Sequence, residues 1–166
     1  MSKAFVAILM GSDSDLPVMK STLDVLKAFD VSYEANILSA HRTPEDTKAY
    51  ITDAEARGCQ VFIAAAGLAA YLAGAVAAHT LKPVMGVPMD GGPLQGMDAL
   101  LSTVQMPGDV PVATVAIGKA GAKNAGYLAA QILSVADSAL GKKLVDERAQ
   151  YAQAIREKNA ALQSKL

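Results

Sequence analysis

Residues 39–44, which read Ser-Ala-His-Arg-Thr-Pro, place an imidazole next to a guanidinium in one short polar segment. Histidine can accept and release a proton near neutral pH, and arginine presents a planar fork of N–H donors to a phosphate or carboxylate. We therefore expect His41 to serve as a general acid or base and Arg42 to bind an anionic group of a substrate. The other histidine, His79, falls inside a predicted alanine-rich helix, where packing or capping is the better explanation.

A second polar turn, Gly-Ser-Asp-Ser-Asp at residues 11–15, follows an apolar run. It matches neither the GxGxxG fingerprint of dinucleotide-binding folds nor the Gly-Lys-Ser/Thr ending of a Walker loop. Between a strand and a helix, such a turn directs backbone N–H groups and hydroxyls at an anion, and its carboxylates could accept from ribose hydroxyls. Capping of the following helix is an equally good explanation of this turn taken alone.

Short apolar runs alternate with helical patterns along the chain. Strands are predicted at residues 5–10, 31–38, 61–65, 83–87 and 110–117. Helices are predicted at residues 17–29, 43–57, 67–80, 97–104, 124–140 and 142–166. This alternation is typical of a doubly wound α/β fold, a parallel five-stranded sheet between two layers of helices. Loops at equivalent strand ends meet at one edge of such a sheet, so both polar turns should share one crevice.

The helix that follows the His-Arg segment has strong start and stop signals. Thr43 offers an N-cap hydroxyl, Pro44 suits the first helical position, and two acidic residues follow in the first turn. Gly58 suits the C-terminal stop. These signals place His41 and Arg42 in the loop just before the helix.

Composition narrows the class of protein. The 166 residues, 52% hydrophobic and 19% charged, predict one globular domain with a sizeable core. A formal net charge of −1 argues against nucleic acid or anionic membranes as partners. The lone Cys59 cannot form an intrachain disulfide, and no Cys/His cluster suggests a metal. The first apolar run is too short to span a membrane and has no secretory cleavage pattern, so we expect a cytoplasmic protein.

The last predicted helix carries a narrow apolar seam at steps of four and seven residues. Its members are Leu140, Leu144, Tyr151, Ile155, Leu162 and Leu166. The seam could pack on its own domain, but it follows a completed fold, so docking on a neighbouring subunit is at least as plausible. Together with the small residues at 69–78, the seam predicts a homo-oligomer.

Taken together, six ordered segments make the chain resemble the PurE family, purine-biosynthesis enzymes that act on aminoimidazole ribonucleotides. The segments lie at residues 10–15, 39–44, 83–88, 102–107, 111–118 and 124–125. The match runs essentially from end to end, and six segments at family spacing are far more specific than any one. The resemblance implies a flavodoxin-like subunit in a homo-octamer with shared active sites. It also implies no need for ATP, metal, biotin or nicotinamide.

The resemblance implies a mutase that moves the carboxylate of N5-carboxyaminoimidazole ribonucleotide from the exocyclic nitrogen to C4. His41 falls on the family's catalytic histidine, and Ser12, Asp15 and Arg42 fall on its substrate-binding positions. We add further substrate-binding residues from the same polar turns and the third strand's end: Gly11, Ser14, Ser39, Ala66 and Gly67.

The chemistry of that reaction fits one histidine. The carbamate nitrogen must receive a proton as carbon dioxide leaves, and C4 must lose a proton after capturing it, so one imidazole can act first as acid and then as base. Carbon dioxide must not escape between the steps, which requires a closed, dry pocket. The loops at 91–96 and 105–108 are the candidate covers.

One stretch departs from the family pattern. Where the family usually has glycine, histidine and proline, this chain has Leu68, Tyr71 and Ala73. Either the pocket of this chain does not require a second histidine, or Tyr71 takes over the hydrogen bond that the family's histidine makes. A related branch carboxylates aminoimidazole ribonucleotide directly with carbon dioxide, and it stays open as the alternative to the mutase.

Two other classes with this architecture are disfavoured. A receiver domain needs a phospho-accepting aspartate at the end of the third strand, where this chain reads Ala-Ala-Ala-Gly at 64–67. A flavin-binding electron carrier needs aromatic walls around its cofactor, and the chain has no Trp and three Phe. A third class, a purely structural module, is disfavoured because it would not need His41 and Arg42 on a loop.

Overall fold

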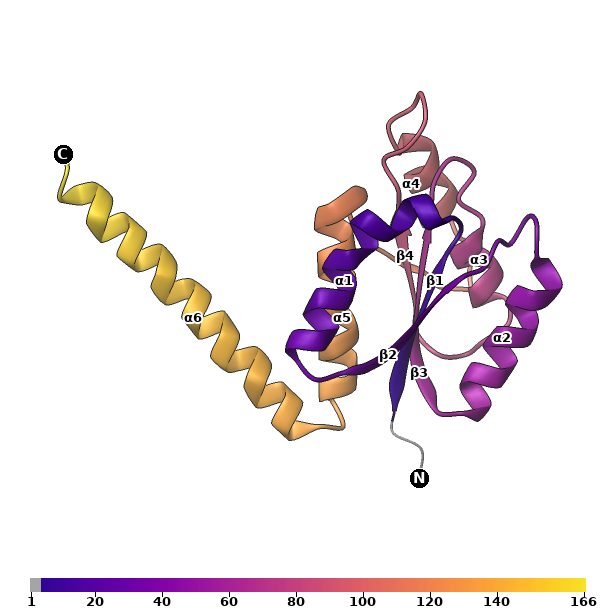
Figure 1. The fold of residues 1–166 in the computed structure, drawn as a ribbon, viewed down its shortest axis with the longest axis horizontal. Coiled ribbons are helices and arrows are strands. Elements are labelled where there is room, and N and C mark those ends of the chain that lie inside the picture. Colours follow the sequence, from indigo (N-terminus) through magenta and orange to yellow (C-terminus); the bar gives the residue numbers. More distant parts are fainter. Residues whose placement is uncertain (1–3) are drawn as a thin grey trace. The chain divides into compact units, whose positions relative to one another are not determined.

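A parallel sheet of five strands organises the computed structural model, which describes residues 4–166 (Figure 1). The chain divides into two compact units, Met1–Ala129 and Ala130–Leu166. The first unit contains the whole sheet, and the second contains the end of α5 (Gly118–Ser134) and all of α6 (Ser138–Gln163). None of the helices described in residues 4–166 combines the length and the apolar character that crossing a membrane requires.

The sheet has the strand order β2-β1-β3-β4-β5. Its strands are β1 (Phe5–Met10), β2 (Ser32–Ile37), β3 (Cys59–Ala66), β4 (Val84–Pro88) and β5 (Ala113–Thr114). Each pair is parallel, which confirms the predicted doubly wound α/β class. The chain leaves β1 toward β2 on one side and then crosses to β3 on the other. Such a reversal creates a crevice at the carboxyl ends of the strands.

The register brings three strand ends level. Met10 pairs with Ile37 of β2 and with Ala65 of β3. The hydrogen bonding then continues into the loops, because the Leu38 N–H donates to the Met10 carbonyl at 2.9 Å and the Gly11 N–H donates to the Ala65 carbonyl at 3.0 Å. The first residues of these loops are therefore placed by the sheet itself.

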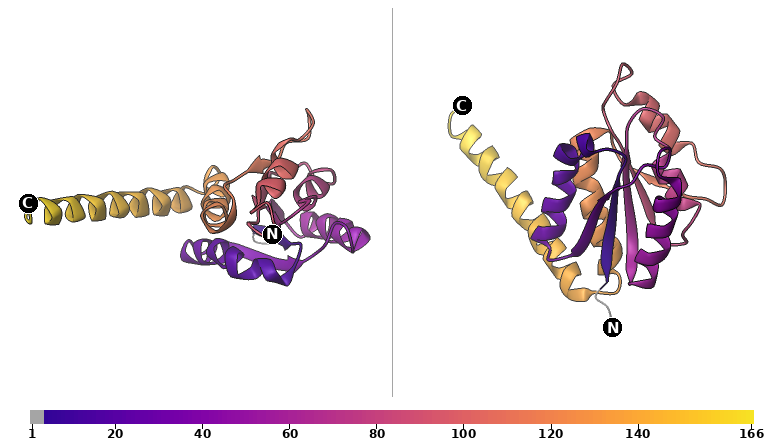
Figure 2. Two further views of the ribbon diagram at one scale, coloured as in Figure 1. Left: turned by 90° about the horizontal axis from the view of Figure 1, so that it is seen from above. Right: turned by 45° about the vertical axis from the view of Figure 1, so that its right-hand side comes forward.

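Helices cover both faces of the sheet (Figures 1 and 2). On one face, α1 (Leu16–Ala28) lies beside residues 118–129 of α5, and the buried Thr22 hydroxyl donates to the Ala122 carbonyl at 2.6 Å. On the other face, α2 (Pro44–Ala56) and α3 (Leu72–Ala77) bury a core against β1 and β3. That core includes Ala7, Leu9, Ile51, Ala54, Phe62, Leu72 and Val76.

Four predicted elements differ clearly from the structure. The helix expected over 67–80 is the shorter α3, because Leu68 takes a left-handed backbone with φ 55°, and His79 lies beyond its end. The strand expected over 110–117 shrinks to β5, consistent with Pro111, which lacks a backbone donor. The helix expected over 124–140 is α5, which starts at Gly118, so the glycine-rich turn is its first turn, and which already ends at Ser134. The helix expected over 142–166 is α6, which starts earlier, at Ser138.

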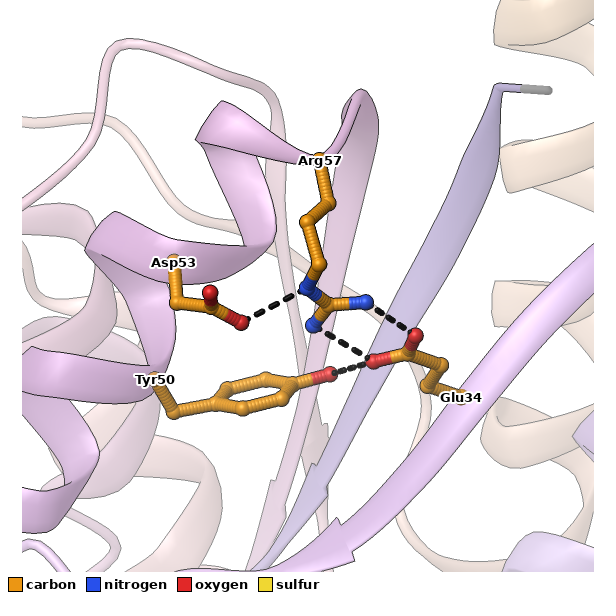
Figure 3. Close-up of polar contacts among 4 residues, drawn as sticks. All are labelled: Glu34, Tyr50, Asp53 and Arg57. Atoms are coloured by element: carbon orange, nitrogen blue, oxygen red, sulfur yellow. Dashed lines mark hydrogen bonds and ion pairs between the residues drawn. The ribbon is translucent and has the colours of Figure 1, made fainter. Parts of the chain in front are cut away.

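The edge strand β2 is tied to α2 by a polar cluster (Figure 3). The Arg57 guanidinium donates to both carboxylate oxygens of Glu34 and, through Nε, to Asp53 Oδ2 at 2.6 Å. The Tyr50 hydroxyl donates to Glu34 Oε2 at 3.0 Å. Arg57 also lies 5.2 Å from the centre of the Phe5 ring. This cluster joins the two elements that flank the loop carrying His41.

Charge pairing in this cluster shifts two titrations. Hydrogen bonding from Arg57 holds the pKa of the Glu34 carboxyl below its usual 4.5, with burial opposing and the Tyr50 hydroxyl assisting. Burial, followed by the bond to Glu34, raises the pKa of Tyr50. Because Glu34 binds its proton more weakly in the folded chain, its contribution to stability is present above about pH 4.5 and is lost as the pH falls through the lower folded value.

We predict that Glu34→Gln lowers the free energy of unfolding at neutral pH. The loss should be about 1 kcal/mol, because the Arg57 and Glu34 side chains are 40% and 37% exposed and solvent screens them. Urea titrations from about pH 7 down to about pH 3 should show the difference from wild type shrinking with acid. The control is Asp146→Asn, which removes the carboxylate of the exposed Lys142–Asp146 pair on α6. An equal, pH-independent effect in both variants would contradict the assignment.

Candidate functional site

A cleft of about 530 Å³ lies at the carboxyl ends of the strands. Its walls come from the loops after β1, β2, β3 and β4. The residues predicted from the sequence all line it: Gly11, Ser12, Ser14, Asp15, Ser39, His41, Arg42, Ala66 and Gly67. The topology thus gathers three segments that are well separated in the sequence into one site.

The 11–15 turn is a closed, self-capped unit. The backbone at Ser12 is extended, and its hydroxyl accepts from the Ser14 N–H at 3.2 Å. In return, Asp15 Oδ2 accepts from the Ser12 N–H at 3.1 Å, which completes a capping box on the short 3₁₀ turn Asp13–Asp15. Capping is therefore observed, but of the 3₁₀ turn itself, because the following helix α1 begins at Leu16 without a side-chain N-cap bond. The same side chains also face the cleft.

Asp15 is a buried carboxyl group in the wall of this cleft, with 8% of its surface exposed. Burial raises its pKa above the usual 3.8, and the nearby Asp13 charge adds to the rise. Bonds from the backbone N–H groups of Ser12 and Gly11 oppose it. A buried carboxylate that receives only backbone hydrogen bonds still has lone pairs to spare. It is suited to accept hydrogen bonds from a ligand's hydroxyl groups.

The loop between β2 and α2 presents His41 and Arg42 at its exposed tip. The Thr43 N–H donates to the Ser39 carbonyl at 2.8 Å, and the Arg42 N–H donates to the Ser39 hydroxyl at 3.1 Å. Ala40 is buried in the core beside them. The predicted N-cap bond from Thr43 is wrong, because its hydroxyl turns back to bond the Ser39 backbone and closes the loop instead.

The His41 imidazole stacks on the ring of Tyr71, with ring centroids 5.4 Å apart and planes 24° apart. Tyr71 comes from the loop between β3 and α3. Within residues 4–166, neither the His41 imidazole nor the Arg42 guanidinium takes part in a hydrogen bond or ion pair. Both groups are therefore free to engage a ligand in the cleft.

Sequence reasoning missed the close approach of two loops at the cleft rim. The end of the Leu68 side chain lies where a Cβ on Gly92 would sit, and Gly92 has a φ of 78°, so a larger residue there would strain the backbone and displace Leu68. Gly91 and Gly92 line the cleft, as expected for the 91–96 loop. The other predicted cover, 105–108, contributes no lining residue, and Met106 faces Gly74 of α3 instead. No local sequence signal marks either contact.

A second cleft of about 730 Å³ lies at the opposite edge, around the start of β4. His79 lines it, together with Glu55, Thr80, Lys82 and Asp109. The Thr80 hydroxyl donates to the Glu55 carboxylate. Although it is larger, it faces the amino ends of the parallel strands, whereas ligands of this fold class bind outside the carboxyl ends. The smaller cleft with His41 is therefore the better candidate.

Two further observations bear on the chemistry. In residues 4–166, no three or more His, Cys, Asp and Glu side chains are grouped so that they could hold a metal ion. Cys59 is fully buried, and burial raises the pKa of its thiol to about 11. It is therefore a core residue and unsuited to act as a thiolate nucleophile.

The family model described as AIR carboxylase matches residues 5–154. The chain belongs to the AIR carboxylase family. Membership of this family confirms the resemblance to PurE proteins that the sequence segments indicated. The crystal structure of Treponema denticola PurE superimposes with a TM-score of 0.87 at 30% sequence identity, covering 96% of this chain and 99% of that one.

Curated relatives of the chain are more similar to it in sequence than the protein of that crystal structure is. The N5-carboxyaminoimidazole ribonucleotide mutase of Bacillus subtilis (strain 168) is 52% identical over 157 residues, covering 95% of this chain and 97% of that protein. The enzyme of the same name from Thermotoga maritima is 49% identical over 158 residues, covering 95% and 91%. The similarity therefore spans nearly the whole of each chain.

We predict that Asp15→Asn changes how stability depends on pH. Because the folded pKa of Asp15 lies above its unfolded value of about 3.8, wild type is most stable relative to the variant below that pH. As the pH rises through 3.8 toward the folded pKa, the free energy of unfolding of wild type should fall relative to that of the variant. Denaturant titrations between about pH 3 and about pH 7 measure it.

The control for this experiment is Asp24→Asn, the same change at an exposed position of α1. It shows what the same change of carboxylate to amide does to stability at a solvent-exposed site. If Asp15→Asn runs parallel to wild type, the carboxyl group is not destabilised by burial in the cleft wall.

Proposed function

We propose that this chain is an N5-carboxyaminoimidazole ribonucleotide mutase of purine biosynthesis. The observation that carries the proposal is 52% identity to such a mutase over 95% of the chain. The cleft supports it, because a proton carrier, an anion-binding arginine and a hydroxyl-rich turn line one pocket at the carboxyl edge of the sheet. These are the groups that a phosphorylated, carboxylated heterocycle needs.

In this proposal the polar loops bind the ribonucleotide. Arg42 pairs with an anionic group of the substrate, and the hydroxyl and backbone N–H groups of the 11–15 turn bind another. Asp15 accepts hydrogen bonds from the ribose hydroxyls. The remaining substrate-binding residues are Gly11, Ser12, Ser14, Ser39, Ala66 and Gly67.

His41 carries the proton. The bond between the exocyclic nitrogen and the carboxylate carbon breaks, its electron pair returns to nitrogen, and the His41 imidazolium protonates that nitrogen as carbon dioxide leaves. The electron-rich C4 then attacks carbon dioxide, and the neutral imidazole removes the C4 proton. The imidazolium is restored, so the reaction is an isomerisation that consumes no oxidant, energy source or net proton.

Carbon dioxide must stay beside the ring between these steps. Leu68, Tyr71 and Met89 give the cleft an apolar wall, and Gly91 and Gly92 at the start of the 91–96 loop also line it. Apolar walls hold no competing water and keep a small neutral molecule close to the heterocycle. We therefore assign the 91–96 loop as the cover of the site.

We further propose a cytoplasmic homo-octamer built from single-domain subunits, with no metal or organic cofactor. Residues 142–166 would dock on a neighbouring subunit, since α6 leaves Val145, Ile155 and Leu162 exposed. A second apolar stripe supports association: α4 (Met97–Val104) exposes Met97, Leu101 and Val104 at helical spacing. The one cysteine, buried and free, is compatible with a reducing compartment.

The substrate can be tested directly. Purified protein given N5-carboxyaminoimidazole ribonucleotide without bicarbonate should form the 4-carboxy product faster than protein given aminoimidazole ribonucleotide with bicarbonate. Initial rates measured by chromatography decide the comparison. Turnover only in the second arm would instead assign direct carboxylation, the alternative that the departures at Leu68, Tyr71 and Ala73 keep open.

His41→Asn should reduce kcat by at least about 100-fold, because general acid–base catalysis contributes that much or more. KM should change little, since the other residues of the cleft still bind the nucleotide. The matched control is His79→Asn, which removes the histidine of the second cleft and should leave both constants unchanged. Near-native turnover by His41→Asn would refute its role as the proton carrier.

A further inference from the structure

We propose that Tyr71 is a positioning residue whose ring holds the His41 imidazole in the plane needed for proton transfer. The inference rests on the proposed function, since it concerns the same site. It assigns to Tyr71 a role carried by the face of its ring rather than by its hydroxyl group. The stacked geometry, with centroids 5.4 Å apart and planes 24° apart, is the observation that carries it.

Stacking suits an imidazole that must transfer protons. Both ring nitrogens lie in the plane of the ring, so their N–H bond and lone pair project from its edge. A neighbour on the ring face therefore restrains the plane while leaving both nitrogens accessible. A hydrogen bond to the nitrogen that does not transfer the proton would also orient the ring. Within residues 4–166 the His41 imidazole makes none, so the stack on Tyr71 is the contact that can do so.

No hydrogen bond or ion pair restrains the His41 side chain in the described part of the chain. It lies at the exposed tip of its loop, and within residues 4–166 the Tyr71 ring is its one aromatic neighbour and no hydrogen bond orients it. Without the stack, rotation about two side-chain torsions would move the nitrogens away from the substrate. Misplacement by about 1 Å can lower a rate substantially.

The backbone at Tyr71 is held by the start of a packed helix, whereas the backbone at His41 belongs to an exposed loop. Its carbonyl accepts from the Ala75 N–H at 2.9 Å, which begins α3, and the next residue, Leu72, is buried at 2% exposure. Just before Tyr71, the Ala70 N–H donates to the Leu68 carbonyl at 2.9 Å. The tyrosine ring is thus presented by the start of a packed helix, while the histidine is presented by a loop.

The hydroxyl group of Tyr71 is not part of this contact. In residues 4–166 it makes no hydrogen bond, and the side chain is 54% exposed. Removal of the hydroxyl should therefore be tolerated, whereas removal of the ring should not. This separates ring stacking from a hydrogen bond donated by the phenol.

The test compares Tyr71→Phe, which keeps the ring, with Tyr71→Leu, which removes it at a partly exposed position where folding should be retained. Tyr71→Phe should keep at least about half of wild-type kcat. Tyr71→Leu should lower kcat by about 10-fold with KM within about 2-fold, since the imidazole loses the contact that orients it while the residues that bind the nucleotide are unchanged.

A second readout examines the free enzyme. Histidine labelled with ¹³C at Cε1 gives two signals, one for each histidine, which His41→Asn and His79→Asn assign. The ring current of Tyr71 should shift the His41 signal in wild type and in Tyr71→Phe. In Tyr71→Leu that shift should disappear while the His79 signal stays in place.

The outcomes separate this inference from the proposed function. If wild type turns over neither ribonucleotide, the proposed function fails, while the His41 signal still tests the stack. If wild type is active and Tyr71→Leu keeps its kcat, the positioning role is wrong. Equal losses in Tyr71→Phe and Tyr71→Leu would also overturn it, because the hydroxyl would then be the functional group.

Discussion

Parallel pairing of β1 with both β2 and β3 is the constraint on which the cleft depends. Met10 faces Ile37 on one side and Ala65 on the other, so three strands end at the same level. Backbone bonds then extend beyond those ends, including one from the Met89 N–H to the Ala66 carbonyl at 2.9 Å. Every loop of the site thus begins from a fixed backbone position, and a slip of one residue would turn its side chains to the opposite face of the sheet.

The site departs from what would be most stable, as functional sites commonly do. Asp15 keeps a buried carboxylate whose raised pKa reports the penalty of its burial. Leu68 has a left-handed backbone at φ 55°, which costs a residue with a Cβ about 1 kcal/mol or more. His41 and Arg42 stand exposed on a loop. The sheet and the Glu34–Arg57 link supply the rigidity that these residues lack.

Sequence patterns predicted the parts of the fold that depend on local signals. The residues of β1 and α4 were predicted with their observed bounds, because apolar runs and turn signals mark them. The gathering of the polar loops followed from one topological rule for parallel sheets. The late start of α3 could not be predicted, since the left-handed Leu68 lies against Gly92 of a distant loop.

Side-chain partners were harder to predict for the same reason. Thr43 has the sequence signature of an N-cap, yet its hydroxyl bonds the backbone of Ser39. Tyr71 stood out only as a departure from the family pattern, and its contact with His41 joins two loops that no periodicity relates. Contacts of this kind depend on where the sheet places each loop, which a sequence read segment by segment does not contain.

A crystal structure with the 4-carboxylated ribonucleotide bound would show whether His41 can carry the proton in this cleft. We expect the ligand in the cleft formed by the loops after β1, β2 and β3, with a His41 ring nitrogen about 3 Å from its carboxylated edge or one water away. Tyr71 should still cover the far face of the imidazole. A ligand bound in the cleft of His79, or one beyond the reach of His41 through a single water, would contradict it.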